Sequence, residues 1–526
     1  MENKKLKLNY KNTTLISLAF FSILMLWQVY NTYCPLFLSD LLHIDQESWL
    51  IGIFMATDNI LALILLPVFG RLSDKTHTRF GKRMPYIIVG MFFAAIIFPF
   101  IPFFYVKGVL AGVIIMMFLI LCIMHMYRTP AVSLMPDITP KPLRSKANGI
   151  INLVGYFGPI IAAVVKMILD YKDHPYIPFF VASFCLLCAA IVLFLAVKEN
   201  EILAKVHDEL LLGEELSQSL DKVEEDKPLS KGDKKNLIIL LLSTFVWFMA
   251  FNALESFLSL YCKNVLGDEK ISGTVTIILT ISSVVTFIPS GILANKIGRK
   301  LSILIGIVCL FVGFLGSAII TPNADIRKEL SFDRTNLSLV LTNDTLNNNK
   351  LTLNSDGTYV LIENNYEKNG NYIANDNYVK LDNEDVYTYY ESNLQYKASI
   401  DKNIAEYKVA NNKIVGYKVA FFVLVAVAGI GWAMINVSSY PMVTELANQS
   451  NIGRISSLYY LASMLAQSVT PVLIGSIMAF GTGYNGLFWY SSILTIIAFG
   501  IFILYKENKK KVEMLKKGFF ESFDSD

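Results

Sequence analysis

The feature that most constrains the fold is a series of long apolar stretches that recur along almost the whole chain. Each has about 20 residues, which is the length an α-helix needs to cross roughly 30 Å of lipid hydrocarbon. The composition agrees, because 54% of the residues are hydrophobic and only 17% are charged, against about 25% charged residues in a typical soluble domain. The sequence therefore predicts an all-α polytopic membrane protein and argues against a soluble enzyme.

Polar breaks between the apolar stretches predict twelve transmembrane helices. Lys and Arg are concentrated in alternate loops, on the same side as the N-terminal segment, and such residues stay in the cytoplasm. We therefore expect a multi-pass protein of the plasma membrane with both termini in the cytoplasm. The predicted helices cover residues 13–38, 48–69, 85–105, 109–135, 148–168, 177–197, 237–261, 271–292, 301–321, 418–440, 456–479 and 485–505.

Two polar segments interrupt this series. The first has Ile202, Leu203 and Val206 at helical spacing among charged residues, which predicts an amphipathic cytoplasmic linker. The second alternates apolar and polar residues around Asp356-Gly357, which predicts a small extracellular β-rich insert. The expected organisation is a six-helix half over 1–197, the linker over 198–236, helices seven to nine over 237–321, the insert over 322–418, helices ten to twelve over 419–505 and a cytoplasmic tail over 506–526.

The two halves share a loop between their second and third helices. The first copy begins at Gly70 and carries Asp74, and the second begins at Gly291 and carries Asn295 at the same spacing. Glycine lets two helices approach closely, and an acid or amide followed by basic residues can hold neighbouring helices by charged hydrogen bonds. The chain therefore contains an internal repeat.

This loop resembles the signature of the major facilitator superfamily, and its longer first copy resembles that of the sugar:cation symporters. The segments that begin at Arg128, Arg144 and Gly431 are similar to the sucrose/proton symporter branch. The resemblance covers the whole bundle and omits the outer insert. It implies two six-helix halves around a central site that is opened to either side in turn by alternating access.

The resemblance also implies a cytoplasmic latch of Asp74, Asp137 and Arg144, with Asn295 and Arg454 among the corresponding residues of the second half. The amide of Asn295 predicts a weaker second latch. The alternative is that these charges only fix the topology. The predicted cytoplasmic gate comprises Gly70, Asp74, Lys75, Arg79, Gly81, Arg83, Asp137, Arg144, Gly291, Asn295, Gly298, Arg299, Glu445 and Arg454.

Ionisable residues inside a transmembrane helix are costly and are therefore functional candidates. Asp58 lies twelve residues before Gly70, or about 18 Å from the helix end and near the midplane. It is the first candidate for a proton-coupling carboxylate, the alternative being a structural acid paired with a fixed cation. Lys166 lies close enough to a helix end to snorkel and is left out. The other coupling candidates are Glu255, Arg128 and His125.

A sugar site needs amide and hydroxyl groups beside an aromatic plate, because sugars present hydroxyls around apolar ring faces. Pairs of a tryptophan and an asparagine four or five residues later recur in helices one, seven and ten. Each residue alone also fits ordinary helix packing. The predicted substrate site contains Trp27, Gln28, Asn31, Asn152, Tyr156, Trp247, Asn252, Glu255, Trp432, Asn436, Tyr459, Tyr460 and Gln467.

The coupling ion is expected to be H⁺ rather than Na⁺. Sodium-coupled relatives carry two carboxylates just before the Pro-x-x-Gly that ends helix two, whereas here residues 62–66 before Pro67 are all apolar. We expect no bound metal, no cofactor, no nucleic-acid partner and no enzymatic activity, because the sequence has no nucleophile–base pair, metal cluster or phosphate-binding loop.

The leading hypothesis is a monomeric secondary transporter that imports a sugar or glycoside, a disaccharide above all, by proton symport. One alternative is a transporter or exporter of another small solute. The other alternative is a surface receptor or adhesion module, in which the insert binds and the bundle is only an anchor. The buried Asp58 and Glu255 argue against a pure anchor, which has no need of such costly groups.

Overall fold

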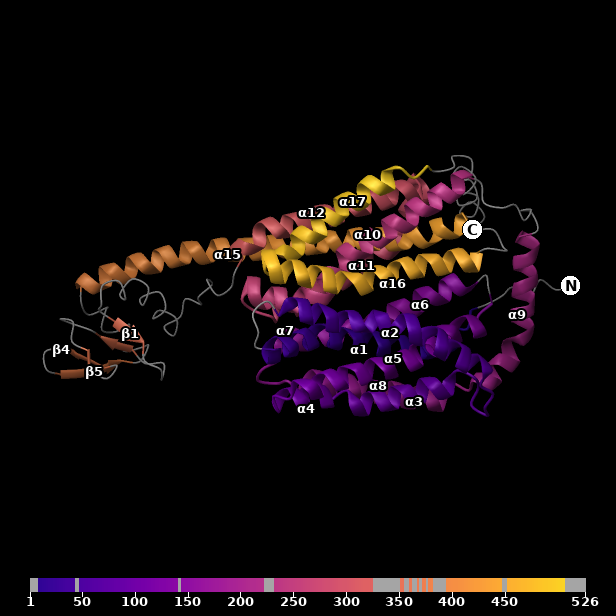
Figure 1. Ribbon diagram of the computed structural model, residues 1–526, viewed down its shortest axis with the longest axis horizontal. Coiled ribbons are helices and arrows are strands. Elements are labelled where there is room, and N and C mark those ends of the chain that lie inside the picture. The colour runs from indigo at the N-terminus through magenta and orange to yellow at the C-terminus, as the bar shows by residue number, and fades with distance from the viewer. Residues whose placement is uncertain are drawn as a thin grey trace. The chain divides into compact units, whose positions relative to one another are not determined.

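A bundle of long helices makes up most of the chain in the computed structural model (Figure 1). The structure describes residues 8–42, 47–140, 143–221, 231–324, 351–353, 359–361, 367–368, 371–374, 377–381, 394–446 and 452–506. Within these residues, twelve helical spans are long and apolar enough to cross a membrane, which confirms the predicted number. The predicted Asp356-Gly357 turn and the tail after residue 506 lie outside the described residues.

The first half of the bundle has two interrupted spans, each of which corresponds to one continuous predicted helix. Pro99 precedes α4, and Pro159 lies in the first turn of α7. A proline has no N–H to donate to the preceding turn, so it is tolerated at the start of a helix but not inside one. The helices are α1 (Tyr10–Leu42), α2 (Ser48–Lys75), α3 (Met84–Ile97), α4 (Phe100–Val106), α5 (Leu110–Ile138), α6 (Arg144–Gly155), α7 (Phe157–Ile168) and α8 (Ile177–Ala196).

The linker begins with a helix, α9 (Glu199–Asp221), only two residues after α8 ends. Ile202 of its predicted apolar face is buried, and α9 packs against the end of α5. Val206 and Glu209 line a small hollow together with residues that precede and open α1. The helix α9 is thus attached to the first half, whereas residues 231–236 of the predicted linker already belong to α10.

The second half supplies the remaining six spans, some of which are extended by short irregular turns. A π-helical segment, η2 (Cys262–Leu266), follows α10, and another, η5 (Met478–Thr482), follows α16. A 3-10 turn, η3 (Thr321–Asn323), follows α12. The long helices are α10 (Lys231–Tyr261), α11 (Ile271–Ile297), α12 (Arg299–Ile320), α15 (Leu394–Glu445), α16 (Ile452–Ile477) and α17 (Gly486–Ile503).

The predicted insert belongs to a second compact unit, which consists of Val265–Asp268 and Ile320–Phe421. Its described strands pair antiparallel in the order β1-β2-β5-β4-β3. They are short, and α15 begins at Leu394, so the last part of the predicted insert is helical. A β-rich insert reaching residue 418 is therefore not supported. The strands are β1 (Leu351–Leu353), β2 (Tyr359–Leu361), β3 (Glu367–Lys368), β4 (Asn371–Ala374) and β5 (Asn377–Leu381).

The two halves of the bundle touch through glycines where α2 lies beside α16 (Figure 1). A Cβ atom added at Gly52 would lie 2.1 Å from the carbonyl oxygen of Pro471, and one added at Gly475 would lie 2.4 Å from that of Ser48. Ser48 Oγ also donates to the Gly475 carbonyl oxygen at 2.9 Å. These contacts lie at the end of α2 far from α9. We call it the opposite end, and the end that carries α9 the linker end.

A side chain at Gly52 is expected to prevent this close approach. The Gly52→Val substitution should lower the free energy of unfolding by about 1–3 kcal/mol, the usual cost of overpacking a tight contact, as measured by thermal unfolding in detergent. Gly500→Ala in α17 is the control, because an added Cβ there meets no atom within 4 Å. Equal stability of Gly52→Val and the native protein would show that α2 and α16 do not pack this closely.

Candidate functional site

A cavity of about 260 Å³ lies between the two halves of the bundle. Polar side chains from both halves line it, together with apolar ones from α1, α10 and α11. A second hollow of about 110 Å³ shares Gln28, Asn31 and Glu255 with it and continues along α10 and α11. Among the predicted substrate residues, the cavity brings together Trp27, Gln28, Asn31, Tyr156, Asn252, Glu255, Trp432 and Gln467.

An aromatic plate forms one wall of this cavity. The rings of Phe251 and Trp432 are parallel within 3°, and their centroids lie 3.8 Å apart. Phe248 meets the same tryptophan edge-on at 5.2 Å. Glu255 follows Phe251 by one helical turn, so its carboxylate lies on the same side of α10 as the plate. The wall thus combines a flat apolar surface with a hydrogen-bond acceptor.

Asp58, which also lines the cavity, forms a buried acid–base pair with His125. Asp58 Oδ2 accepts a hydrogen bond from the Trp27 indole nitrogen at 2.7 Å. His125 Nε2 lies 3.2 Å from Asp58 Oδ1 and 3.0 Å from the Asp58 carbonyl oxygen. Both ionisable side chains are almost fully buried. Three of the four predicted coupling residues are adjacent here, because the Arg128 guanidinium carbon lies 4.2 Å from the centroid of the Trp27 ring.

Glu255 differs from Asp58 in its surroundings. Its carboxylate faces the open space of both hollows, and it accepts a long hydrogen bond of 3.3 Å from the side-chain amide of Asn252. No ion pair to Glu255 occurs among the residues that the structure describes. It is therefore available to a ligand or to a proton, whereas Asp58 is already held by protein groups.

Five predicted substrate residues do not line the cavity. Trp247 is fully buried and packs edge-on against Phe502. It lies five residues before Asn252, and five residues turn a helix by about 140°, so the two cannot share a face. Asn436 donates instead to the carbonyl oxygen of Trp432 at 2.9 Å. Asn152, Tyr459 and Tyr460 are the other three.

The two tyrosines form a cluster of their own. Tyr459 shares a hydrogen bond of 2.8 Å with Ser439, and both Tyr459 and Tyr460 pack against the ring of Tyr440. Asn152 is an exposed residue of α6. The tyrosine cluster joins α15 to α16, which the spacing of its residues along the sequence does not reveal.

Among the residues that the structure describes, three ion pairs join the halves at the opposite end. Lys263 Nζ lies 2.6 Å from Asp40 Oδ1, and Lys270 Nζ lies 3.7 Å from Asp170 Oδ2. Tyr171 donates to Asp40 at 2.7 Å. Burial, and then its hydrogen bond to Asp40, raises the pKa of the Tyr171 hydroxyl, so this group stays protonated and keeps donating. The opposite end is therefore closed by charges as well as by glycines.

The third pair involves Lys166, which was not among the residues predicted for the site. Its side chain is fully buried rather than snorkelling, and Nζ lies 3.5 Å from Glu269 Oε1. It also lies 5.2 Å from the centroid of the Tyr33 ring and 5.0 Å from that of Tyr171, within the range of cation–π attraction. The sequence signal for this pair was a lysine inside a predicted transmembrane span, with three apolar residues between it and the next charged residue.

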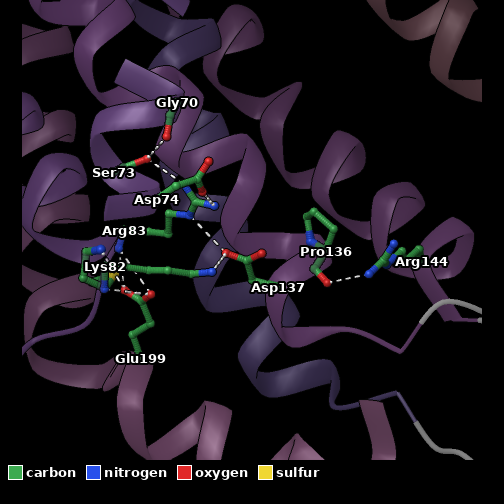
Figure 2. A network of polar contacts seen from close by, with 10 residues as sticks. Gly70, Ser73, Asp74, Lys82, Arg83, Pro136, Asp137, Arg144 and Glu199 are labelled. Carbon is green, nitrogen blue, oxygen red and sulfur yellow. Dashed lines mark hydrogen bonds and ion pairs between the residues drawn. The ribbon is translucent and has the colours of Figure 1, made fainter. Parts of the chain in front are cut away.

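Two of the three residues predicted for the first latch, Asp74 and Asp137, lie together at the linker end around Arg83 (Figure 2). Arg83 donates through Nε to Asp137 at 3.0 Å and through Nη2 to Asp74, and Lys82 Nζ lies 3.0 Å from Asp137. Arg144 does not meet these acids. It donates instead to backbone carbonyl oxygens, including that of Pro136 at 2.9 Å.

In the second half, Arg299 pairs with Glu445. Arg454 makes no ion pair with the described residues and is exposed, and the side chain of Asn295 lies outside what the structure describes. Gly298 has a φ of 94°, a conformation that glycine adopts without strain. The described ion pairs at the linker end thus lie within one half or the other, whereas those at the opposite end join the halves.

A family model that matches most of the chain decides which family the chain belongs to. The model of the Major Facilitator Superfamily matches residues 14–328 and 414–522. The chain belongs to the Major Facilitator Superfamily. It is thus a multi-pass membrane transporter with that superfamily's fold. The residues between the two matched ranges fall in the second compact unit. No curated protein sequence matches the chain.

Solved structures share the fold at low sequence identity. A D-xylose–proton symporter has a TM-score of 0.56 at 13% identity, covering 94% of this chain and 97% of that chain. A bacterial homologue of the iron transporter ferroportin in an inward-facing state has a TM-score of 0.56 at 12% identity, covering 95% and 100%. The nucleoside transporter NupG has a TM-score of 0.53 at 12% identity, covering 95% and 100%. Their transported solutes differ, so they establish the fold and not the substrate.

The buried Lys166–Glu269 pair should respond strongly to removal of one partner. Lys166→Met is expected to lower the free energy of unfolding by about 3–5 kcal/mol, because Glu269 loses the cation that compensates its burial. Lys166→Met/Glu269→Gln should recover most of this loss. Thermal unfolding in detergent measures both effects, with Lys172→Met, at an exposed position nearby, as the control. A double variant no more stable than Lys166→Met would contradict the pairing.

Proposed function

We propose that this transporter imports a glycoside, a disaccharide above all, together with protons. The observation that carries the proposal is the cavity between the halves, where an aromatic plate and amides lie beside two carboxylates in distinct settings. Its volume of about 260 Å³ lies just below the roughly 300–1,000 Å³ typical of small-molecule sites. A D-xylose–proton symporter among the structures of the same fold agrees with this substrate class.

The cavity walls suit a sugar ring. One face of the ring would lie on the Phe251–Trp432 plate, where its C–H groups replace water with apolar contact. Asn31 and Gln467 would exchange hydrogen bonds with the ring hydroxyls, because amides both donate and accept. Glu255 would accept from a hydroxyl. These residues come from both halves, so a bound sugar would favour states in which the halves lie close to it.

Asp58 and His125 would carry the coupled proton. Protonation of Asp58 removes the negative charge that accepts the hydrogen bond from the Trp27 indole and that lies beside His125, and so weakens its hold on Trp27. Since Trp27 lines the cavity, a change in its contact with Asp58 would reach the substrate directly. Arg128 over the same ring would limit how far the tryptophan can turn.

We infer that the linker end faces the cytoplasm of a plasma-membrane protein and that the opposite end faces outward. The excess of Lys and Arg in the linker-side loops supports this orientation. With it, the conformation described is closed to the outside by glycine contacts and ion pairs. The second compact unit would then be extracellular, and the transporter is taken to act as a monomer.

Substrate-induced charge movement in proteoliposomes tests the proposal. A panel of glycosides is applied with and without Na⁺, at about pH 6 and about pH 8, on either side of the ordinary histidine pKa. We expect a current that is larger at the lower outside pH and indifferent to Na⁺. In Asp58→Asn it should fall to background, because an amide cannot take up the proton.

Asp173→Asn, at an exposed position outside the cavity, is the matched control and should retain the full current. Silence towards every glycoside would favour a transporter or exporter of another solute. A current that requires Na⁺ would contradict proton coupling, and a full current in Asp58→Asn would remove Asp58 from the coupling mechanism.

A further inference from the structure

A carboxylate of the linker helix is buried in the loop that precedes α3. Glu199, the first residue of α9, has no exposed surface. As Figure 2 shows for this network, its oxygens accept hydrogen bonds of 2.9–3.2 Å from the backbone N–H groups of Lys82, Arg83 and Met84. Three consecutive N–H groups at a helix N-terminus carry partial positive charge and favour an anion. Glu199 supplies that anion from a segment more than a hundred residues away in sequence.

The loop is shaped for this carboxylate. Gly81 has a φ of 110°, which strains any residue with a side chain. A Cβ atom at this position would lie 2.1 Å from Glu199 Oε2. Glycine is therefore required at this position for two reasons, the backbone conformation and the space that Glu199 fills.

Arg83 connects this contact to the latch. Its backbone N–H binds Glu199, while its guanidinium binds Asp74, Asp137 and Ser73 within the first half. Arg83 is thus held at the main chain by the linker helix and at the side chain by the ends of α2 and α5. Any movement of Glu199 away from the loop releases the backbone of the residue that joins both acids.

The start of α9 is attached at a second point. The side-chain amide of Asn200 donates to the carbonyl oxygens of Thr78 and Arg79 at 3.1 Å. Along the chain, α9 leads on to α10 of the second half. The segment that connects the two halves therefore begins with a cluster of hydrogen bonds to the latch of the first half.

We propose that Glu199 is a positioning residue that couples the linker helix to the Arg83 latch and stabilises the state in which the linker end is open. With Glu199 in place, the guanidinium of Arg83 is kept among acids of its own half. Without it, the backbone of Arg83 is no longer fixed, its guanidinium can leave Asp74 and Asp137, and the linker end closes more readily. The proposal rests on the alternating access proposed above, but not on the identity of the substrate.

Distance measurement between spin labels tests this directly. Cysteines at Arg71 and Lys296, exposed positions near the linker-end termini of α2 and α11, carry the labels in a background without the six native cysteines. Double electron–electron resonance in lipid, without substrate, gives the populations of open and closed linker ends. Glu199→Gln should shift the ratio towards closed by about five- to tenfold, comparable to loss of one helix cap. Glu201→Gln, at an exposed position on the same helix, should leave it unchanged.

Chemical rescue separates an anion site from general loss of structure. Glu199→Ala leaves a hole in front of the three N–H groups, and millimolar formate should restore the native ratio of populations. Formamide, of similar size but uncharged, should not. Glu199→Gln, which leaves no hole, should not respond to formate.

The outcomes are distinct. A native ratio in Glu199→Gln and Glu199→Ala, or a lack of rescue by formate, would overturn the proposal. A single label distance in the unmodified protein under all conditions would instead count against alternating access itself. If Glu199→Ala fails to fold, the other two variants still test the proposal. The ratio should shift towards closed in Glu199→Gln and stay native in Glu199→Asp, which keeps the negative charge.

Discussion

The high cost of placing charge in a lipid-embedded bundle is the constraint on which the described structure depends. An isolated ionised group in hydrocarbon costs several kcal/mol, and a partner from another segment lowers this cost. Asp58 of α2 is held by His125 of α5, and Lys166 of α7 lies beside Glu269. These pairs join α2 to α5, and α7 to the segment just before α11, and the helices of each pair are in contact.

The features governed by helix geometry and hydropathy could be predicted from the sequence. The number of spans follows from the length of the apolar stretches, and the depth of Asp58 follows from its distance to Gly70 along α2. Trp27 and Asn31 both line the cavity, because residues four apart lie on one face of a helix. Trp247 and Asn252 are five residues apart and do not share a face, and only Asn252 lines the cavity. Pro99 and Pro159 signal the two helix interruptions, but a prediction from the length of the apolar stretches gives continuous helices there.

Features that depend on contacts between distant segments could not be predicted in this way. Nothing in the linker sequence distinguishes Glu199 from the exposed Glu201, and only the folded chain brings the former to the start of α3. The pairing of Asp137 with Arg83 rather than with Arg144 has the same origin, since all three lie near one end of the first half. Spacing identifies the groups that a latch needs, and packing selects among them.

The composition of the closed opposite end has a consequence for the response to solvent. Separating the halves there exposes glycine backbone and six charged side chains that the closed form keeps largely from water. Opening therefore takes up a layer of hydration water, while the glycines themselves have no rotamers to rearrange. A solute that is excluded from protein surfaces, such as trimethylamine oxide, disfavours exposure of such surface. Osmotic pressure would thus oppose any separation of the halves at this end.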